Sequence, residues 1–122
     1  MRRIALALFV LLAGVAQAQQ HGISLTWTAS TDATASSTAN IYTATGTCPA
    51  SGIGTLTWTK YVPPTGTTIP AGGSYVVPGF TGGQIVCVYV TNVIGTVETQ
   101  PSNTGGGMIP YAKPNLTIVI LN

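Results

Sequence analysis

Residues 85–93 read Ile-Val-Cys-Val-Tyr-Val-Thr-Asn-Val, and this stretch decides the fold. It is the longest apolar run after the N-terminal segment, and its β-branched and aromatic residues suit a strand that is covered on both faces. Gly82-Gly83 stands just before it, and glycine pairs interrupt strands. We therefore expect residues 85–93 to form a central strand of a sheet.

Shorter runs elsewhere alternate apolar residues with Thr and Ser, which is the two-residue period of half-buried strands. We expect these strands at residues 23–27, 40–43, 55–61 and 74–77. Glycine- and proline-rich segments separate the runs, and no helical period is present after residue 18. Short strands with turn residues between them predict an all-β fold, a β-sandwich, with inward-facing Ile23, Leu25 and Trp27.

The N-terminus has the three parts of a secretory signal peptide. Arginines at positions 2–3 precede the apolar residues 4–15, and Ala16-Gln17-Ala18 fits a cleavage site. The apolar run is shorter than the roughly 20 residues of a membrane-spanning helix, and no cysteine directly follows Ala18 to carry a lipid. We expect residues 1–18 to be removed and the protein to be secreted, periplasmic or extracellular, without a membrane anchor. A short buried helix is the alternative.

Charge is scarce in this chain. Charged residues make up 5% of it, against roughly 25% in average domains. The net charge is +2, but both arginines lie within residues 1–18, and the remaining charges cancel: Lys60, Lys113, Asp32 and Glu98. Because nucleic-acid binding depends on basic residues that neutralise phosphates, we expect no nucleic-acid partner.

The chain has two cysteines, Cys48 and Cys87. Disulfides persist in secreted proteins, so we expect these two to pair. Closing a loop of about 40 residues would stabilise the fold by about 4 kcal/mol. Two buried thiols and half of a metal site are the alternatives, but a metal site lacks further ligands, since His21 is the sole histidine. We expect no metal and no cofactor.

Catalytic groups are equally sparse. A nucleophilic triad needs a base beside a serine or cysteine, and His21 lies close to the new N-terminus. The only acids are Asp32 and Glu98, which is the smallest number that a glycosidase pair would need. The sequence therefore predicts a protein that is not an enzyme.

Several short motifs follow one another in the order seen in a known family. They are Leu25-Thr-Trp-Thr-Ala-Ser30, Asn40-Ile-Tyr42, Ala44-Thr-Gly-Thr-Cys-Pro-Ala-Ser-Gly52, Trp58-Thr-Lys60, Cys87-Val-Tyr-Val-Thr91 and Glu98-Thr-Gln-Pro-Ser-Asn103. This series, from about His21 to Thr104, resembles a bacterial or phage-type fibronectin type III domain. The resemblance implies an immunoglobulin-like β-sandwich over residues 19–110.

The resemblance also implies roles for single residues. The inward-facing positions of the family would be Trp27, Ile41, Tyr75, Val86, Val88 and Val90, and Phe80 would match an apolar residue in the turn after the fifth strand. Asp32 and Glu98 would fall in separate loops, which does not suit a glycosidase pair. Cys87 would then point outward, and the Cys48–Cys87 bridge would lie at the surface. Two large family residues are missing, because a corner tyrosine is replaced by Val86 and a core aromatic by Ala39. An immunoglobulin-type domain stays open as an alternative, since Cys48, Trp58 and Cys87 have its Cys…Trp…Cys order.

The family begins with a strand that has no counterpart before residues 23–27. Instead, Pro114-Asn-Leu-Thr117 resembles the start of such a strand, in an extension over residues 111–122. Residues 111–114 reach at most about 14 Å, less than the about 17–20 Å of a typical strand, so closure onto its own sheet in the usual antiparallel direction is strained. Exchange with another molecule would use the inward-facing phase: Leu116, Ile118 and Ile120. Alternatively, 116–121 is the last strand of a monomer, and 104–115 is a loop.

Two functions are open at this point. One is a secreted, non-enzymatic module for adhesion or extracellular assembly, whose partner is a protein or a second copy at a sheet edge. The other is a carbohydrate- or small-ligand-binding module. Its candidate residues are Trp58 and Tyr61, which lie on opposite phases of one strand, so that one of them could be exposed and stack on a sugar. The alternative is that both pack on the sandwich or its loops.

Overall fold

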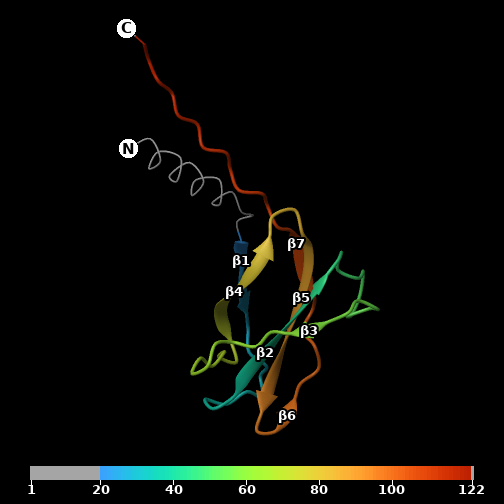
Figure 1. Ribbon diagram of the computed structural model, residues 1–122. Helices are drawn as coiled ribbons and strands as arrows, with labels where there is room; N and C mark the ends of the chain where they lie inside the picture. The colour runs from blue at the N-terminus through green and yellow to red at the C-terminus, as the bar shows by residue number, and fades with distance from the viewer. Residues whose placement is uncertain (1–19, 122) are drawn as a thin grey trace, which may run out of the picture.

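The computed structural model describes residues 20–121, which form two β-sheets packed together as a sandwich (Figure 1). Within this range the chain has no helix, so the described residues include no candidate membrane-spanning helix. The signal peptide predicted for residues 1–18 lies outside the described residues. The strands are β1 (Gln20–Trp27), β2 (Thr38–Thr45), β3 (Thr59–Lys60), β4 (Gly73–Thr81), β5 (Ile85–Ile94), β6 (Val97–Glu98) and β7 (Gly105–Met108).

The two sheets differ in size. β1 pairs antiparallel with β4 alone, and this pair is the smaller sheet. In the larger sheet β5 lies between β2 on one side and both β6 and β7 on the other. β6 pairs with the end of β5 and β7 with its beginning, so the last edge is one broken strand. The prediction that residues 85–93 form a central strand is confirmed.

The core lies between the sheets. Ile41 is fully buried, and Val86, Val88 and Val90 of β5 are buried beside it. Ile23, Leu25 and Trp27 of β1 are half-buried and pack against the same cluster. The predicted inward faces of these two strands are therefore confirmed. Tyr75 is half-buried against the core and Phe80 is buried within it.

All five predicted strands have somewhat different bounds in the structure, and two of them differ most. The strand expected at residues 55–61 is reduced to β3, because Trp58 donates from Nε1 to the carbonyl of Ile53, 3.1 Å away, and so folds the preceding residues into a loop. The strand expected at 74–77 extends to Thr81, through Pro78. An edge strand tolerates a proline because the missing N–H need not pair.

A β-bulge lets β4 continue past Pro78. Two residues, Pro78 and Gly79, face the single Gly22 of β1, where the pairing register shifts. Gly79 has a φ of 96°, a left-handed conformation that an L side chain rarely adopts. The bulge keeps the strand paired as far as Thr81, at the same end of the sandwich as the start of β1.

A buried asparagine fixes the far end of β1. Asn92 Oδ1 accepts a hydrogen bond from the backbone N–H of Ser30 at 2.7 Å, and its Nδ2 donates to the carbonyl of Ala71, also at 2.7 Å. The indole Nε1 of Trp27 donates to the same carbonyl. These bonds hold the end of β1 over β5 and so define the space between the two strands.

Candidate functional site

The outer edge of β1 has no strand partner among residues 20–121. β1 pairs with β4 on one side only. A free strand edge presents unpaired N–H and C=O groups, and proteins usually cover, shorten or charge such edges because they invite pairing with another chain. Residues 20–27 carry no Lys, Arg, Asp or Glu to oppose this.

A groove follows this vacant edge between the two sheets. It has three adjoining sections of about 310, 460 and 330 Å³, which share lining residues with one another. Their volumes are comparable to small ligand pockets, but they lie in a row along a strand. β1 and β5 supply the apolar walls: Ile23, Leu25, Trp27, Val86, Val88 and Val90.

Two glycines of β7, Gly105 and Gly107, leave the groove open on its other side. Gly105 pairs with Val88 and Gly107 with Val86, and paired residues of antiparallel strands face the same way. A Cβ atom at Gly105 or Gly107 would meet no atom within 4 Å. The inward face of β7 is therefore empty where an ordinary strand would carry side chains into the core. We name the groove between β1 and β7 the β1 groove.

The C-terminal segment, residues 110–121, extends away from the sandwich without pairing (Figure 1). Its apolar side chains are between 73% and 87% exposed: Leu116, Ile118, Val119, Ile120 and Leu121. The alternative that 116–121 is the last strand of the sandwich is wrong, because β6 and β7 occupy the edge of β5. The segment, which we call the tail, is an apolar strand sequence without a sheet.

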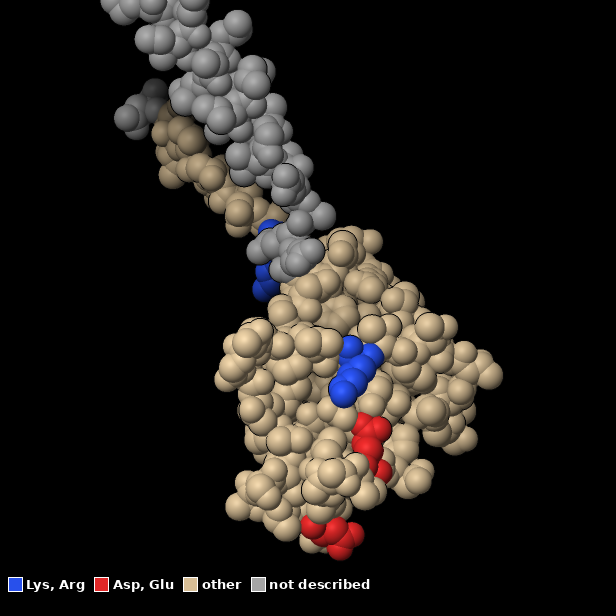
Figure 2. Space-filling view, turned by 60° about the horizontal axis from the view of Figure 1, so that its bottom comes forward, with Lys and Arg blue, Asp and Glu red and all other residues tan. Residues whose placement is uncertain are grey.

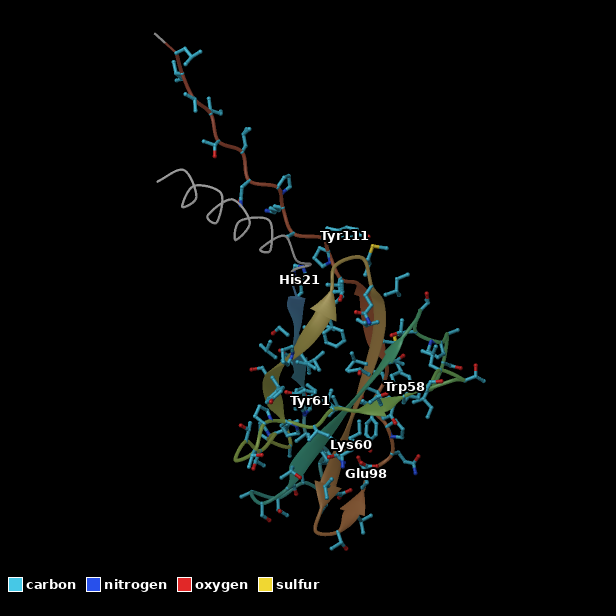
Figure 3. The ribbon with its side chains drawn as sticks, viewed as in Figure 1. His21, Trp58, Lys60, Tyr61, Glu98 and Tyr111 are labelled. Carbon is cyan, nitrogen blue, oxygen red and sulfur yellow. A yellow bond between two sulfur atoms is a disulfide. The ribbon has the colours of Figure 1, made fainter. Side chains whose placement is uncertain are left out.

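The tail starts from a fixed point at the end of the sandwich where β1 begins. Ile109 donates a hydrogen bond to Gln84 and accepts one from Gly83, at 2.8 and 2.7 Å. Tyr111 lies against Gly82 and Gly83, where a side chain on either glycine would collide with it. Figure 3 shows Tyr111 and His21, near the start of β1, at this same end. The contact of Tyr111 with this glycine pair was not predicted, because a glycine pair before a strand indicates only a turn.

The cysteines are joined as predicted, with 5.1 Å between the Cα atoms of Cys48 and Cys87. The prediction that this bridge lies at the surface holds only in part, since Cys48 is half-buried but Cys87 is 0% exposed. Cys87 does face outward from the sheet, but the loop that carries Cys48 is held against that face and covers the sulfur. This loop runs from residue 46 to residue 58.

Trp58 and Tyr61 lie apart, on different faces, and each has a packing partner (Figure 3). The Trp58 ring meets Tyr89 edge-on, with 4.7 Å between the ring centroids, on the outer face of the larger sheet. Tyr61 packs against the core and against Tyr75, with 3.3 Å between the two hydroxyl oxygens. The structure therefore does not bring the two predicted ligand-binding residues together, and glycan binding stays a prediction.

Glu98 is the centre of a polar cluster on the outer face of the larger sheet. Its Oε2 accepts hydrogen bonds from Asn40, from the Tyr42 hydroxyl at 2.7 Å and from Thr91 at 3.0 Å. The bonds from Asn40 and Tyr42 lower the pKa of Glu98. Burial, together with Glu98, raises the pKa of Tyr42 to about 12. Tyr42 also stacks on Tyr89, with ring centroids 4.7 Å apart.

This cluster gives stability a defined pH dependence. A lowered pKa means that folded Glu98 binds its proton less readily than unfolded Glu98, so its stabilisation holds above the ordinary pKa and is lost as pH falls through the folded value. We expect Glu98→Gln to flatten the acid limb of the stability curve. It should also lower the pKa of Tyr42 from about 12 but leave it above 10, because burial is the larger cause.

Urea unfolding between neutral and acidic pH and an ultraviolet titration of tyrosinate test these two expectations. Val97→Thr is a suitable control, since it alters an exposed neighbouring side chain without touching the carboxylate. An unchanged Tyr42 titration in Glu98→Gln would contradict the coupling.

Charge is sparse elsewhere on the body. Figure 2 shows small, isolated basic and acidic patches on an otherwise uncharged face. No group of three or more His, Cys, Asp or Glu residues that could hold a metal ion is present within residues 20–121. A surface of this kind can recognise a partner through backbone pairing and apolar contact rather than through charge.

The chain was compared with protein families, curated proteins and solved structures, and no match was found.

Proposed function

We propose that the protein is a secreted, non-enzymatic module that assembles outside the cytoplasm by strand exchange. The tail of one copy would add a strand to the vacant β1 edge of the next. Adding a strand to an open sheet edge is a general mode of recognition, in which backbone hydrogen bonds supply affinity and pockets for alternate side chains supply specificity. Adhesion or extracellular scaffolding would follow from the assembled form.

The complementarity of two features carries the proposal. One chain contains an exposed apolar strand without a sheet and a sheet edge with an apolar groove but no strand. Either feature alone would be a liability for a secreted protein, since exposed apolar strands and edges promote uncontrolled association. Joined between copies, each covers the other.

The position of the tail favours exchange between molecules over closure within one. β7 and the tail run toward the end of the sandwich where β1 begins, so the tail runs antiparallel to β1. Antiparallel closure within one molecule would first carry the chain past all eight residues of β1, about 26 Å at 3.3 Å per residue. Residues 111–114 span at most about 14 Å. The tail can pair antiparallel with the β1 of a second copy placed beyond this end without first running back along its own sandwich.

Secretion and the family resemblance support the same proposal. A disulfide between Cys48 and Cys87 fits an oxidising compartment. The observed pairing of β1 with β4 fits a fibronectin type III-like sandwich in which these are the second and fifth strands, with no counterpart of the first strand paired to β1 within residues 20–121. The tail would supply that missing strand from a neighbour.

Removal of residues 114–122 tests the proposal. We expect the mature chain, residues 19–122, to form concentration-dependent oligomers in sedimentation velocity experiments. The truncated chain should sediment as a monomer with the same unfolding midpoint as the monomeric full-length chain, because residues 114–121 are exposed and pair with no strand. A mature chain that stays monomeric at its highest attainable concentration would contradict strand exchange.

A further inference from the structure

We infer that the donated strand enters the β1 groove antiparallel to β1, in one register: Leu116 opposite Trp27, Ile118 opposite Leu25 and Ile120 opposite Ile23. This inference rests on the proposed function and specifies its geometry.

The direction of the donated strand follows from where each molecule presents its tail and its β1 groove. The tail leaves the sandwich at the end where β1 begins, and it extends outward (Figure 1). In a head-to-tail arrangement with copies in the same orientation, it reaches the next copy at the opposite end, where β1 finishes. It then runs along β1 in the reverse direction. Such repeated, non-closing contacts build a polar filament.

The register follows from the alternation of side chains. In an antiparallel pair, residues directly opposite each other face the same side of the sheet. The inward residues of β1 are Ile23, Leu25 and Trp27, and the pairing above places one apolar tail residue opposite each of them. A shift by one residue would place Thr117 in the groove and move two isoleucines to the solvent side.

The β7 glycines supply the space for two of these side chains. The section of the groove beside Ile23 and Leu25 is lined by Gly105 and Gly107, whose inward side is open. Ile118 and Ile120 come to lie at this section in the inferred register. Gly105 and Gly107 therefore leave a space for a neighbour's side chains, a role that a loop does not require.

Four double-cysteine variants separate the inferred pairing from the parallel one. The outward positions Ser24 and Thr26 of β1 are exposed, as are Thr117 and Val119 of the tail. In the inferred register Ser24 faces Val119 and Thr26 faces Thr117. Parallel alignment of the same residues would exchange the partners. Directly opposed residues lie about 4.5–5.5 Å apart, within disulfide range, whereas a two-residue offset exceeds about 7 Å, where a bridge does not form.

We expect Ser24→Cys with Val119→Cys, and Thr26→Cys with Thr117→Cys, to give ladders of covalent oligomers on non-reducing gels. The two exchanged combinations carry the same substitutions and should give at least about tenfold less cross-linked product. The native bridge should not interfere, because Cys87 is buried. Gly107→Val fills the open space on the inward side of β7. It should leave the unfolding midpoint unchanged and strongly reduce oligomer formation.

The outcomes distinguish this inference from the function it rests on. Ladders only in the exchanged combinations, or oligomers without any ladder, would overturn the register and direction but leave strand exchange in place. Cross-linked monomers would show closure within one molecule, and the absence of oligomers in all variants and in the parent chain would mean no assembly. Either of these last two results would overturn both.

Discussion

Replacing Ile118 by Asp should abolish self-association, whereas Val119→Asp should leave most of it intact. In the inferred pairing Ile118 enters the β1 groove, and burying an isoleucine contributes about 1.5–3 kcal/mol. An aspartate in that position loses this contribution and adds the cost of burying an unpaired carboxylate. The association constant should fall at least about 100-fold, since each 1.4 kcal/mol is a factor of ten.

Sedimentation equilibrium of both variants beside the parent chain measures this difference. The two positions are adjacent, similarly exposed in the monomer at 73% and 74%, and receive the same charge. Nonspecific association of an apolar tail would therefore weaken equally in both. Equal losses would show that the tail associates without a defined inward face.

Loss of the disulfide is the second large effect. Replacing Cys48 and Cys87 together by Ala should lower the free energy of unfolding by about 4 kcal/mol, because the bridge closes a loop across 39 positions and restricts the unfolded chain. The loop over residues 46–58 would also lose its covalent tie to β5. For a domain of this size, such a change is a large share of the total stability.

Urea unfolding of the double variant, with oxidised parent chain as reference, measures the loss. Parent chain reduced under denaturing conditions and refolded in the presence of reductant is the matched control, since it retains both sulfur atoms. A decrease below about 1 kcal/mol in both samples would mean that packing of Trp58 on Tyr89, not the bridge, holds the loop.

The parts of the fold predicted from sequence are those with a clear two-residue period. β1 and β5 have strong alternation or an unbroken apolar run, and their inward residues lie where this period places them. β3 and β4 differ because a side-chain hydrogen bond within a loop limits the one and a bulge extends the other. The two-residue period of a sequence does not indicate that Trp58 closes its own loop, or that Gly79 lets a strand continue past a proline.

The same distinction holds for the site. The tail has strand periodicity, so its apolar phase could be identified from sequence, and the structure leaves it exposed. The burial of Cys87 could not be predicted, since alternation gives only the direction of a side chain and not what folds over it. The β7 glycines gave no signal either, because glycine has low strand propensity and its role here is the space it leaves.

The extended path of the tail has a mechanical consequence. In a filament joined as inferred, tension along the chain of copies would act parallel to β1 and to the donated strand. The backbone hydrogen bonds between antiparallel strands are perpendicular to this direction, so a pull would load all of them at once in shear rather than one after another. Each junction would then resist force best along the filament axis and least when peeled from one end, a property suited to a fibre under flow.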